Sequence, residues 1–123
     1  MGLDMYLFKR NKKTDELTEI GYWRKHNALH GFMNTFTDHD IENLEKVSLT
    51  KDNLQEILEL SEAIIRKDLD PEYSMPVFEG FFYGSYEYDE WYFHRTQDTI
   101  EIMKNALRDT NFDEDEVYYQ AWW

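Results

Sequence analysis

Apolar and polar residues alternate at the start of the chain. Leu3, Met5 and Leu7 recur at a spacing of two, which predicts a strand with one buried face over Leu3–Phe8. The basic residues that follow indicate a turn or loop. Leu17–Trp23 is then expected to form a second short strand that runs into a helix.

Apolar residues three to four positions apart predict two helices in the middle of the chain. The first covers 24–37, although Gly31 lies inside it. The second covers about 51–67 and has clearer start signals. Thr50 suits the N-cap, and Leu49 and Leu54 occupy the two positions of a hydrophobic staple. Residues 47–49, just before this helix, suit a short strand.

Aromatic residues dominate the next segment, with nine in the sixteen residues from Phe78 to Phe93. Within it, Phe78–Tyr83 and Glu90–His94 are expected to form two strands around a turn at Gly84-Ser85. Thr96 is expected to cap a third helix whose apolar stripe is Ile100, Met103 and Leu107. An acidic loop at 110–116 and an aromatic final strand at Val117–Trp123 complete the chain.

This order of elements predicts an α+β fold. Helices interleave with strands that parallel crossovers cannot all join, so a small mixed or antiparallel sheet with about three helices is expected. The length of 123 residues fits one domain, and no repeat or linker divides it. We therefore expect a single domain over 1–123.

The net charge of −13 is unevenly distributed. Residues 1–30 carry +2, residues 31–70 carry −6 and residues 71–123 carry −9. This balance argues against direct nucleic-acid binding, which needs a basic face. The carboxylates form either a solvated surface or a face for a basic partner.

Several other classes of protein are disfavoured. Without cysteine there are no disulfides, no thiolate chemistry and no cysteine-based metal sites. The chain lacks both the ~18–20 consecutive apolar residues of a membrane span and a secretory signal at its start. We therefore expect a cytoplasmic protein that does not engage a membrane.

Motifs for metal binding or catalysis are incomplete. His26 and His30 have the spacing of a zinc-binding pair, but Asn27 replaces the metalloprotease glutamate and no third ligand is indicated. Asp109, Asn111 and Asp113 begin like a calcium loop, whose glycine and closing glutamate are missing. No metal, cofactor or catalytic residue is therefore predicted, and the balance favours a protein that is not an enzyme.

Two segments combine aromatic rings with cations and amide or imidazole groups. If the segment 21–30 is also helical, Trp23, Asn27, His30 and Asn34 form a stripe beside the apolar face, with Arg24 and Lys25 at the helix start. The second segment, 81–93, places Tyr88 and Trp91 near Asp89. Rings of this kind stack on a base, cations neutralise phosphate, and polar groups orient the ligand. The plainer alternative is that the aromatics form the core and Arg24 pairs with a carboxylate. The predicted ligand-binding residues are Trp23, Arg24, Lys25, Asn27, His30, Tyr88, Asp89 and Trp91.

Four stretches occur in a characteristic order. They are Met-Gly-Leu-Asp-Met-Tyr-Leu at 1–7, Gly-Tyr-Trp-Arg-Lys-x-Asn-x-x-His at 21–30, Phe-Tyr-Gly-Ser-x-x-Tyr-Asp-Glu-Trp-Tyr-Phe at 82–93 and Asp-Thr-Ile-Glu-Ile at 98–102. Together they resemble a family of small uncharacterised bacteriophage and prophage proteins. The resemblance covers most of the chain, least distinctively about 38–75. It implies the host cytoplasm and an action on the host, such as blunting its defences, but no particular activity.

Three functional hypotheses follow. The first is a non-enzymatic binding protein that sequesters a small anionic, nucleotide-like ligand. The second is an acidic inhibitor that uses the carboxylates of 38–72 and 109–116 as a DNA mimic against a basic host defence protein. The third is a nucleotide- or sugar-directed enzyme with His30 and Asp89 as acid and base. The C-terminal strand ending in Trp122-Trp123 would either form a homodimer edge or cap the core.

Overall fold

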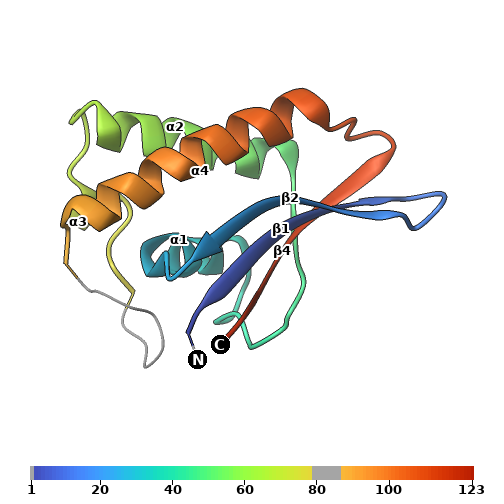
Figure 1. Cartoon of the computed structure of the whole chain (residues 1–123), viewed down its shortest axis with the longest axis horizontal. Coiled ribbons are helices and arrows are strands. Elements are labelled where there is room, and N and C mark those ends of the chain that lie inside the picture. Colours follow the sequence, from blue (N-terminus) through green and yellow to red (C-terminus); the bar gives the residue numbers. More distant parts are fainter. Residues whose placement is uncertain (1, 79–86) are drawn as a thin grey trace.

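The computed structural model describes residues 2–78 and 87–123 as one α+β domain (Figure 1). Its strands are β1 (Asp4–Asn11), β2 (Leu17–Arg24), β3 (Val47–Leu49) and β4 (Asp115–Trp122). Its helices are α1 (Asn27–Met33), the 3-10 turn η1 (Asn34–Phe36), α2 (Lys51–Ile65), α3 (Pro71–Ser74) and α4 (Glu90–Asp109). The predicted fold class is confirmed, and the sheet is antiparallel throughout.

The strands lie in the order β2-β1-β4-β3. β4 is therefore an interior strand, with β1 on one side and β3 on the other. The chain before β3 extends this cover, because the Leu44 amide donates to the carbonyl of Ala121 at 2.8 Å. Trp123 packs against His30, with ring centroids 5.2 Å apart. The C-terminal strand therefore packs against the core through Trp123, while its role in a homodimer stays a prediction.

One face of the sheet carries the core. Met5 and Leu7 of β1 alternate with residues that face the other way, as do Tyr119 and Ala121 of β4, and all four are fully buried. The helices lie on this inner face of the sheet, with α2 and α4 side by side (Figure 1). Within the described ranges, no helix has both the length and the apolar character needed to cross a membrane.

The contact between β2 and α4 is unusually close. A Cβ on Gly21 would lie 2.5 Å from Cγ2 of Ile102, so only glycine lets the helix approach the strand this far. Two residues along β2, the buried Trp23 indole donates from Nε1 to Oγ1 of Thr99 at 2.9 Å. This contact aligns α4 with the end of β2.

The predicted start of α2 is confirmed in detail. Thr50 is the N-cap, and its hydroxyl accepts from the Asn53 amide at 3.1 Å. The Asn53 side-chain oxygen in turn accepts from the Thr50 amide at 2.9 Å, which completes a capping box. Leu49 and Leu54 are both buried, as the staple requires. The four predicted strands at 3–8, 17–23, 47–49 and 117–123 are also present, with ends shifted by at most three residues.

The first predicted helix is shorter than 24–37. Lys25 has φ of 57°, a left-handed conformation that separates β2 from α1. The helix begins only at Asn27, and after Met33 it tightens into η1. Gly31 lies inside it because a Cβ there would lie 2.7 Å from Cβ of Phe78.

The predicted strand over Glu90–His94 is wrong. These residues form the first turns of α4, because the Asp89 carboxylate accepts from the amides of Trp91 and Tyr92, both at 3.1 Å. Thr96 is consequently an interior helix residue, and its hydroxyl donates to the carbonyl of Tyr92. The strand expected over Phe78–Tyr83, apart from Phe78, and the turn at Gly84-Ser85 lie outside the described residues.

We predict that Gly21→Ala destabilises the domain by about 1–3 kcal/mol, because the added methyl group displaces α4 from β2. Urea denaturation of the wild type and the variant measures this loss. In the double variant Gly21→Ala/Ile102→Ala the clash is absent, so the cost should be smaller than the sum of the two single costs. If the free-energy costs of the two substitutions are additive, the contact between Gly21 and Ile102 does not determine how closely α4 packs on β2.

Candidate functional site

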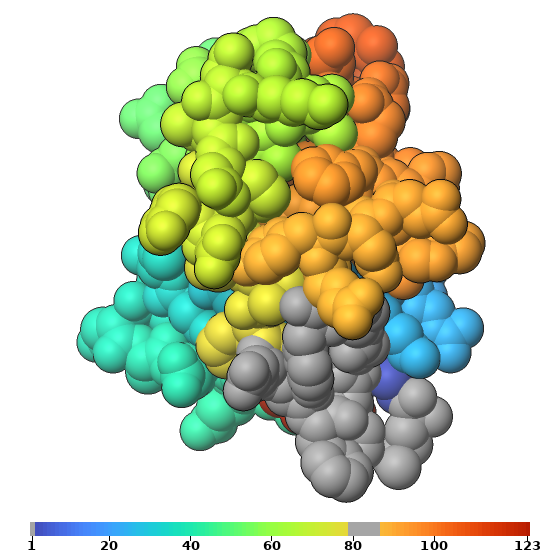
Figure 2. All heavy atoms as spheres, turned by 90° about the vertical axis from the view of Figure 1, so that its left-hand side faces the viewer, coloured from blue at the N-terminus to red at the C-terminus, as the bar shows by residue number. Residues whose placement is uncertain are grey.

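The end of β2, the start of α1 and the first turns of α4 meet at one corner of the molecule. The Lys25 amide donates to the carbonyl of Leu3 at 2.7 Å, which anchors the chain after β2. Nε of Arg95 donates to the carbonyl of Arg24 at 3.0 Å, which ties α4 to the same point. Figure 2 shows this face, with the end of β2 in blue beside the orange first half of α4.

A small hollow opens at this corner. Its volume is about 10 Å³, enough for one atom of the size of a water oxygen. Its wall includes Lys25, Arg95 and the imidazole of His26, together with the acidic residues Glu87 and Asp89. His26 is 2% exposed, and its Nε2 has no hydrogen-bond partner among the described residues. Burial, and to a smaller extent the Arg95 charge, lower the pKa of His26 to about 3.

An exposed tryptophan lies beside the hollow. Trp91 is 56% exposed, and the Arg95 guanidinium carbon lies 5.9 Å from its ring centroid. Glu90, Trp91 and His94 line an open depression of about 410 Å³, a size within the range of small-molecule sites. The corner thus offers a ring surface next to positive charge.

The pairing of the arginines singles out this corner. Arg10 pairs with Asp15 and Glu116, Arg66 with Asp68, and Arg108 with Asp109. The other two arginines, Arg24 and Arg95, have no carboxylate partner in the described part of the chain, although acidic residues outnumber basic ones 26 to 13. We call Arg24, Lys25, Trp91 and Arg95 the cationic corner.

Three of the eight predicted ligand-binding residues belong to the cationic corner, namely Arg24, Lys25 and Trp91. Asn27 and Asp89 also line the hollow, but their side chains accept hydrogen bonds from backbone amides. The Asn27 side-chain oxygen accepts from the Phe78 amide at 3.0 Å, and Asp89 caps α4. Both therefore help to frame the corner.

The remaining three predicted residues lie apart from the hollow or inside the core. Trp23 is only 3% exposed and bonds to Thr99, so its ring has no free face for stacking. Nδ1 of His30 lies 2.6 Å from the Tyr119 hydroxyl, and burial lowers the pKa of His30 to about 4. The Tyr88 hydroxyl accepts from the Val77 amide at 3.1 Å.

Sequence reasoning missed Arg95 and His26. Arg95 follows Trp91 by four residues, so the two share one side of a helix, but the region was expected to be a strand. This four-residue spacing was therefore visible in the sequence. It indicates that the two side chains are neighbours only if the helix starts at Asp89. His26 was considered only as half of a zinc-binding pair, because its place at the hollow depends on packing against α4.

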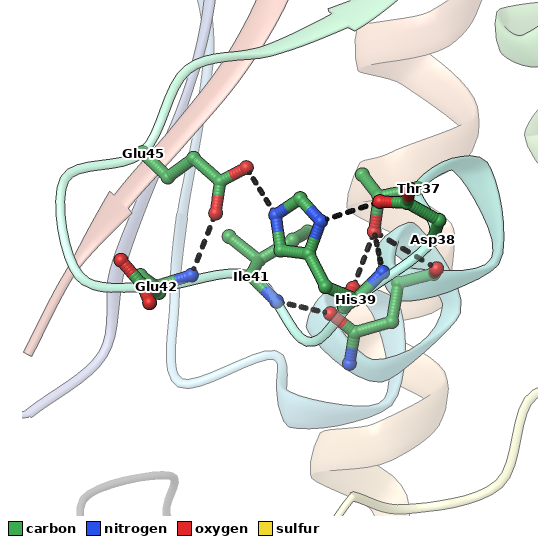
Figure 3. Close-up of polar contacts among 7 residues, drawn as sticks. Thr37, Asp38, His39, Ile41, Glu42 and Glu45 are labelled. Carbon is green, nitrogen blue, oxygen red and sulfur yellow. Dashed lines mark hydrogen bonds and ion pairs between the residues drawn. The ribbon is translucent and has the colours of Figure 1, made fainter.

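A second polar cluster lies in the loop before β3 (Figure 3). His39 bridges two carboxylates, with Nδ1 at 2.8 Å from Asp38 and Nε2 at 2.6 Å from Glu45. The other Glu45 oxygen accepts from the Glu42 amide at 2.9 Å, and Asn34 accepts from the Ile41 amide at 2.8 Å. These bonds shape the exposed loop that leads into β3.

Neither a metal site among the described residues nor a similar known protein indicates a function for the chain. Across residues 2–78 and 87–123, no three His, Cys, Asp or Glu side chains are grouped to hold a metal ion. Comparisons with protein-family models, curated proteins and solved structures each found no match. The interpretation of the cationic corner therefore depends on its geometry.

We predict that acid destabilises the fold through His26 and His30. Their folded-state pKa values of about 3 and about 4 lie below the unfolded value of 6.5, so only the unfolded chain takes up protons as the pH falls below 6.5. Each histidine should lower the free energy of unfolding by up to about 1.4 kcal/mol per pH unit in this range. Urea denaturation between pH 7 and pH 4.5 measures the slope, and His26→Leu should remove one histidine's share. An unchanged slope in His26→Leu would contradict the assignment.

We predict the opposite pH dependence for His39. Its hydrogen bonds to Asp38 and then to Glu45 raise its pKa above the ordinary value of 6.5. Its stabilising contribution is therefore present below pH 6.5 and disappears as the pH rises through the raised pKa. Comparison of the wild type with His39→Gln by urea denaturation should show a difference at pH 6 that shrinks at pH 9. A difference that does not depend on pH would contradict the charged bridge.

Proposed function

We propose that the chain is a non-enzymatic binding protein for a small anionic ligand that carries an aromatic base. The observation that carries the proposal is Arg95, an arginine without a carboxylate partner among the described residues, which lies beside Lys25 at the hollow of a strongly acidic protein. A guanidinium group suits phosphate oxygens, and Lys25 adds a second positive charge at the same hollow.

The dimensions of the corner restrict how such a ligand binds. A hollow of about 10 Å³ cannot enclose a nucleotide, so only one ligand oxygen would enter it. The base would lie outside, on the exposed ring of Trp91 above the open depression. A ligand with its phosphate near Arg95 and its base on Trp91 would span these two features.

This proposal gives the predicted residues different roles. Lys25, Trp91 and Arg95 would touch the ligand, while Asn27 and Asp89 hold the surrounding backbone. In the phage setting implied by the sequence resemblance, such a protein would sequester a nucleotide signal of host defence. Binding alone would suffice for this role, without turnover.

The acidic-inhibitor hypothesis is the second candidate. It is supported by Asp52, Glu56 and Glu59, which are exposed on one helix, α2, and form no ion pair within the described residues. In the other acidic segment, however, Asp109 pairs with Arg108 and Glu116 with Arg10. Part of the charge assigned to phosphate mimicry is therefore neutralised within the chain, which favours the cationic corner.

We predict that ADP-ribose or a cyclic dinucleotide binds the wild type and that substitutions in the cationic corner weaken the binding. Isothermal titration calorimetry should show a loss of about tenfold for Trp91→Ala, the magnitude of one base stacked on an aromatic ring. Arg95→Ala should cost at least as much, because it removes both the phosphate partner and the cation beside the ring.

Arg66→Ala is the matched control, because Arg66 is exposed and pairs with Asp68 at 2.9 Å, away from the corner. It should leave ligand affinity unchanged. Higher salt should weaken binding, since the ligand is anionic. No binding by any member of the two ligand classes, or an equal loss in Arg66→Ala, would refute the proposal.

A further inference from the structure

No described helix covers the outer face of the sheet (Figure 1). By strand alternation this face carries a row of aromatic side chains. The Tyr6 ring is stacked on Trp122 at a centroid distance of 4.3 Å and on Phe8 at 5.7 Å. Tyr22 lies 5.1 Å from Tyr6, and Tyr118 lies 5.5 Å from Phe8. The row thus crosses three strands, β2, β1 and β4.

Part of this apolar surface is in contact with water, although Tyr118 is only 5% exposed. Tyr22 is 44% exposed, Trp122 is 37% exposed, and Leu17 at the β2 end of the face is 51% exposed. A contiguous exposed apolar patch on a folded domain is typical of an interaction surface.

The charges on this face indicate what can cover it. By strand alternation its charged residues are Asp4, Glu19 and Glu116 against Arg10 and Arg24, and Lys46 lies over the Tyr118 ring at 5.3 Å. Their sum is zero, whereas the whole chain carries −13. Two copies repel each other through their acidic surfaces, and here the repulsion is locally absent.

The ring geometry argues against a nucleic-acid strand as the occupant. A base needs the flat face of a ring on which to stack. The faces of Tyr6 are turned to Trp122 and Phe8, with interplanar angles of 21° and 12°. With its faces toward these two rings, Tyr6 offers none to a base.

We propose that two copies of this chain associate through the outer faces of their sheets. β1 has eight residues and the sheet four strands, so the face measures about 26 Å by about 14 Å, or roughly 400 Å². A stable interface buries about 800 Å² per partner, so this smaller face should give a weak dimer. Salt should strengthen it, because screening reduces the repulsion between two chains of charge −13.

Sedimentation velocity of the full chain over the micromolar range tests the proposal. The wild type should shift from monomer to dimer as concentration rises, at lower concentration in higher salt. Trp122→Arg should raise Kd at least about tenfold, since it places a charge within the aromatic row. Trp91→Arg is the matched control, because it removes an exposed tryptophan and changes the charge equally, but on α4.

Leu17→Glu is a second variant. It should fold like the wild type, because Leu17 is half exposed at the start of an edge strand. It should also raise Kd. A monomer at all concentrations and salt levels would overturn the proposal, as would equal weakening by Trp91→Arg. Quenching of Trp122 by a single-stranded oligonucleotide that Trp91→Arg retains and Trp122→Arg loses would also overturn it, in favour of a nucleic-acid occupant.

Discussion

The close contact between β2 and α4 determines how the rest of the molecule is arranged. With only a hydrogen atom at Gly21, the helix approaches the sheet closely enough for Trp23 to bond to Thr99 inside the core. The same alignment brings Arg95 to the carbonyl of Arg24, and it buries His26 beneath Arg95 and Tyr92. Packing in the core and the geometry of the cationic corner therefore have one cause.

Most elements could be predicted because their signals are local. The alternation of β1 and the capping box at Thr50 depend on residues a few positions apart. The start of α4 was obscured because aromatic residues favour strands, and because the buried side of the helix includes Thr96 and Thr99. These threonines hide the apolar stripe, yet each donates its hydroxyl to a helix carbonyl and so can be buried.

The predicted ligand-binding residues were harder to assign, because burial depends on partners distant in sequence. Trp23 and His30 combine apolar and polar groups, so the sequence alone is compatible with a core or a ligand role. In the structure, Thr99 and Tyr119 satisfy their polar atoms from 76 and 89 residues away. By contrast, Arg24 is the last residue of β2 and Lys25 follows it, where the chain turns. No neighbouring strand or helix covers these two residues fully.

The two surfaces proposed here have different relations to the overall acidity. In a protein with an excess of carboxylates, most arginines are expected to form ion pairs. Arg24 and Arg95 are informative because neither has a carboxylate partner among the described residues. On the outer face of the sheet, acidic and basic groups instead balance around the aromatic row. Salt should consequently act in opposite directions on the two, weakening the attraction of an anion and easing the approach of a second chain. The sign of the salt dependence therefore distinguishes ligand binding at the cationic corner from association through the outer face, although Arg24 lies next to both.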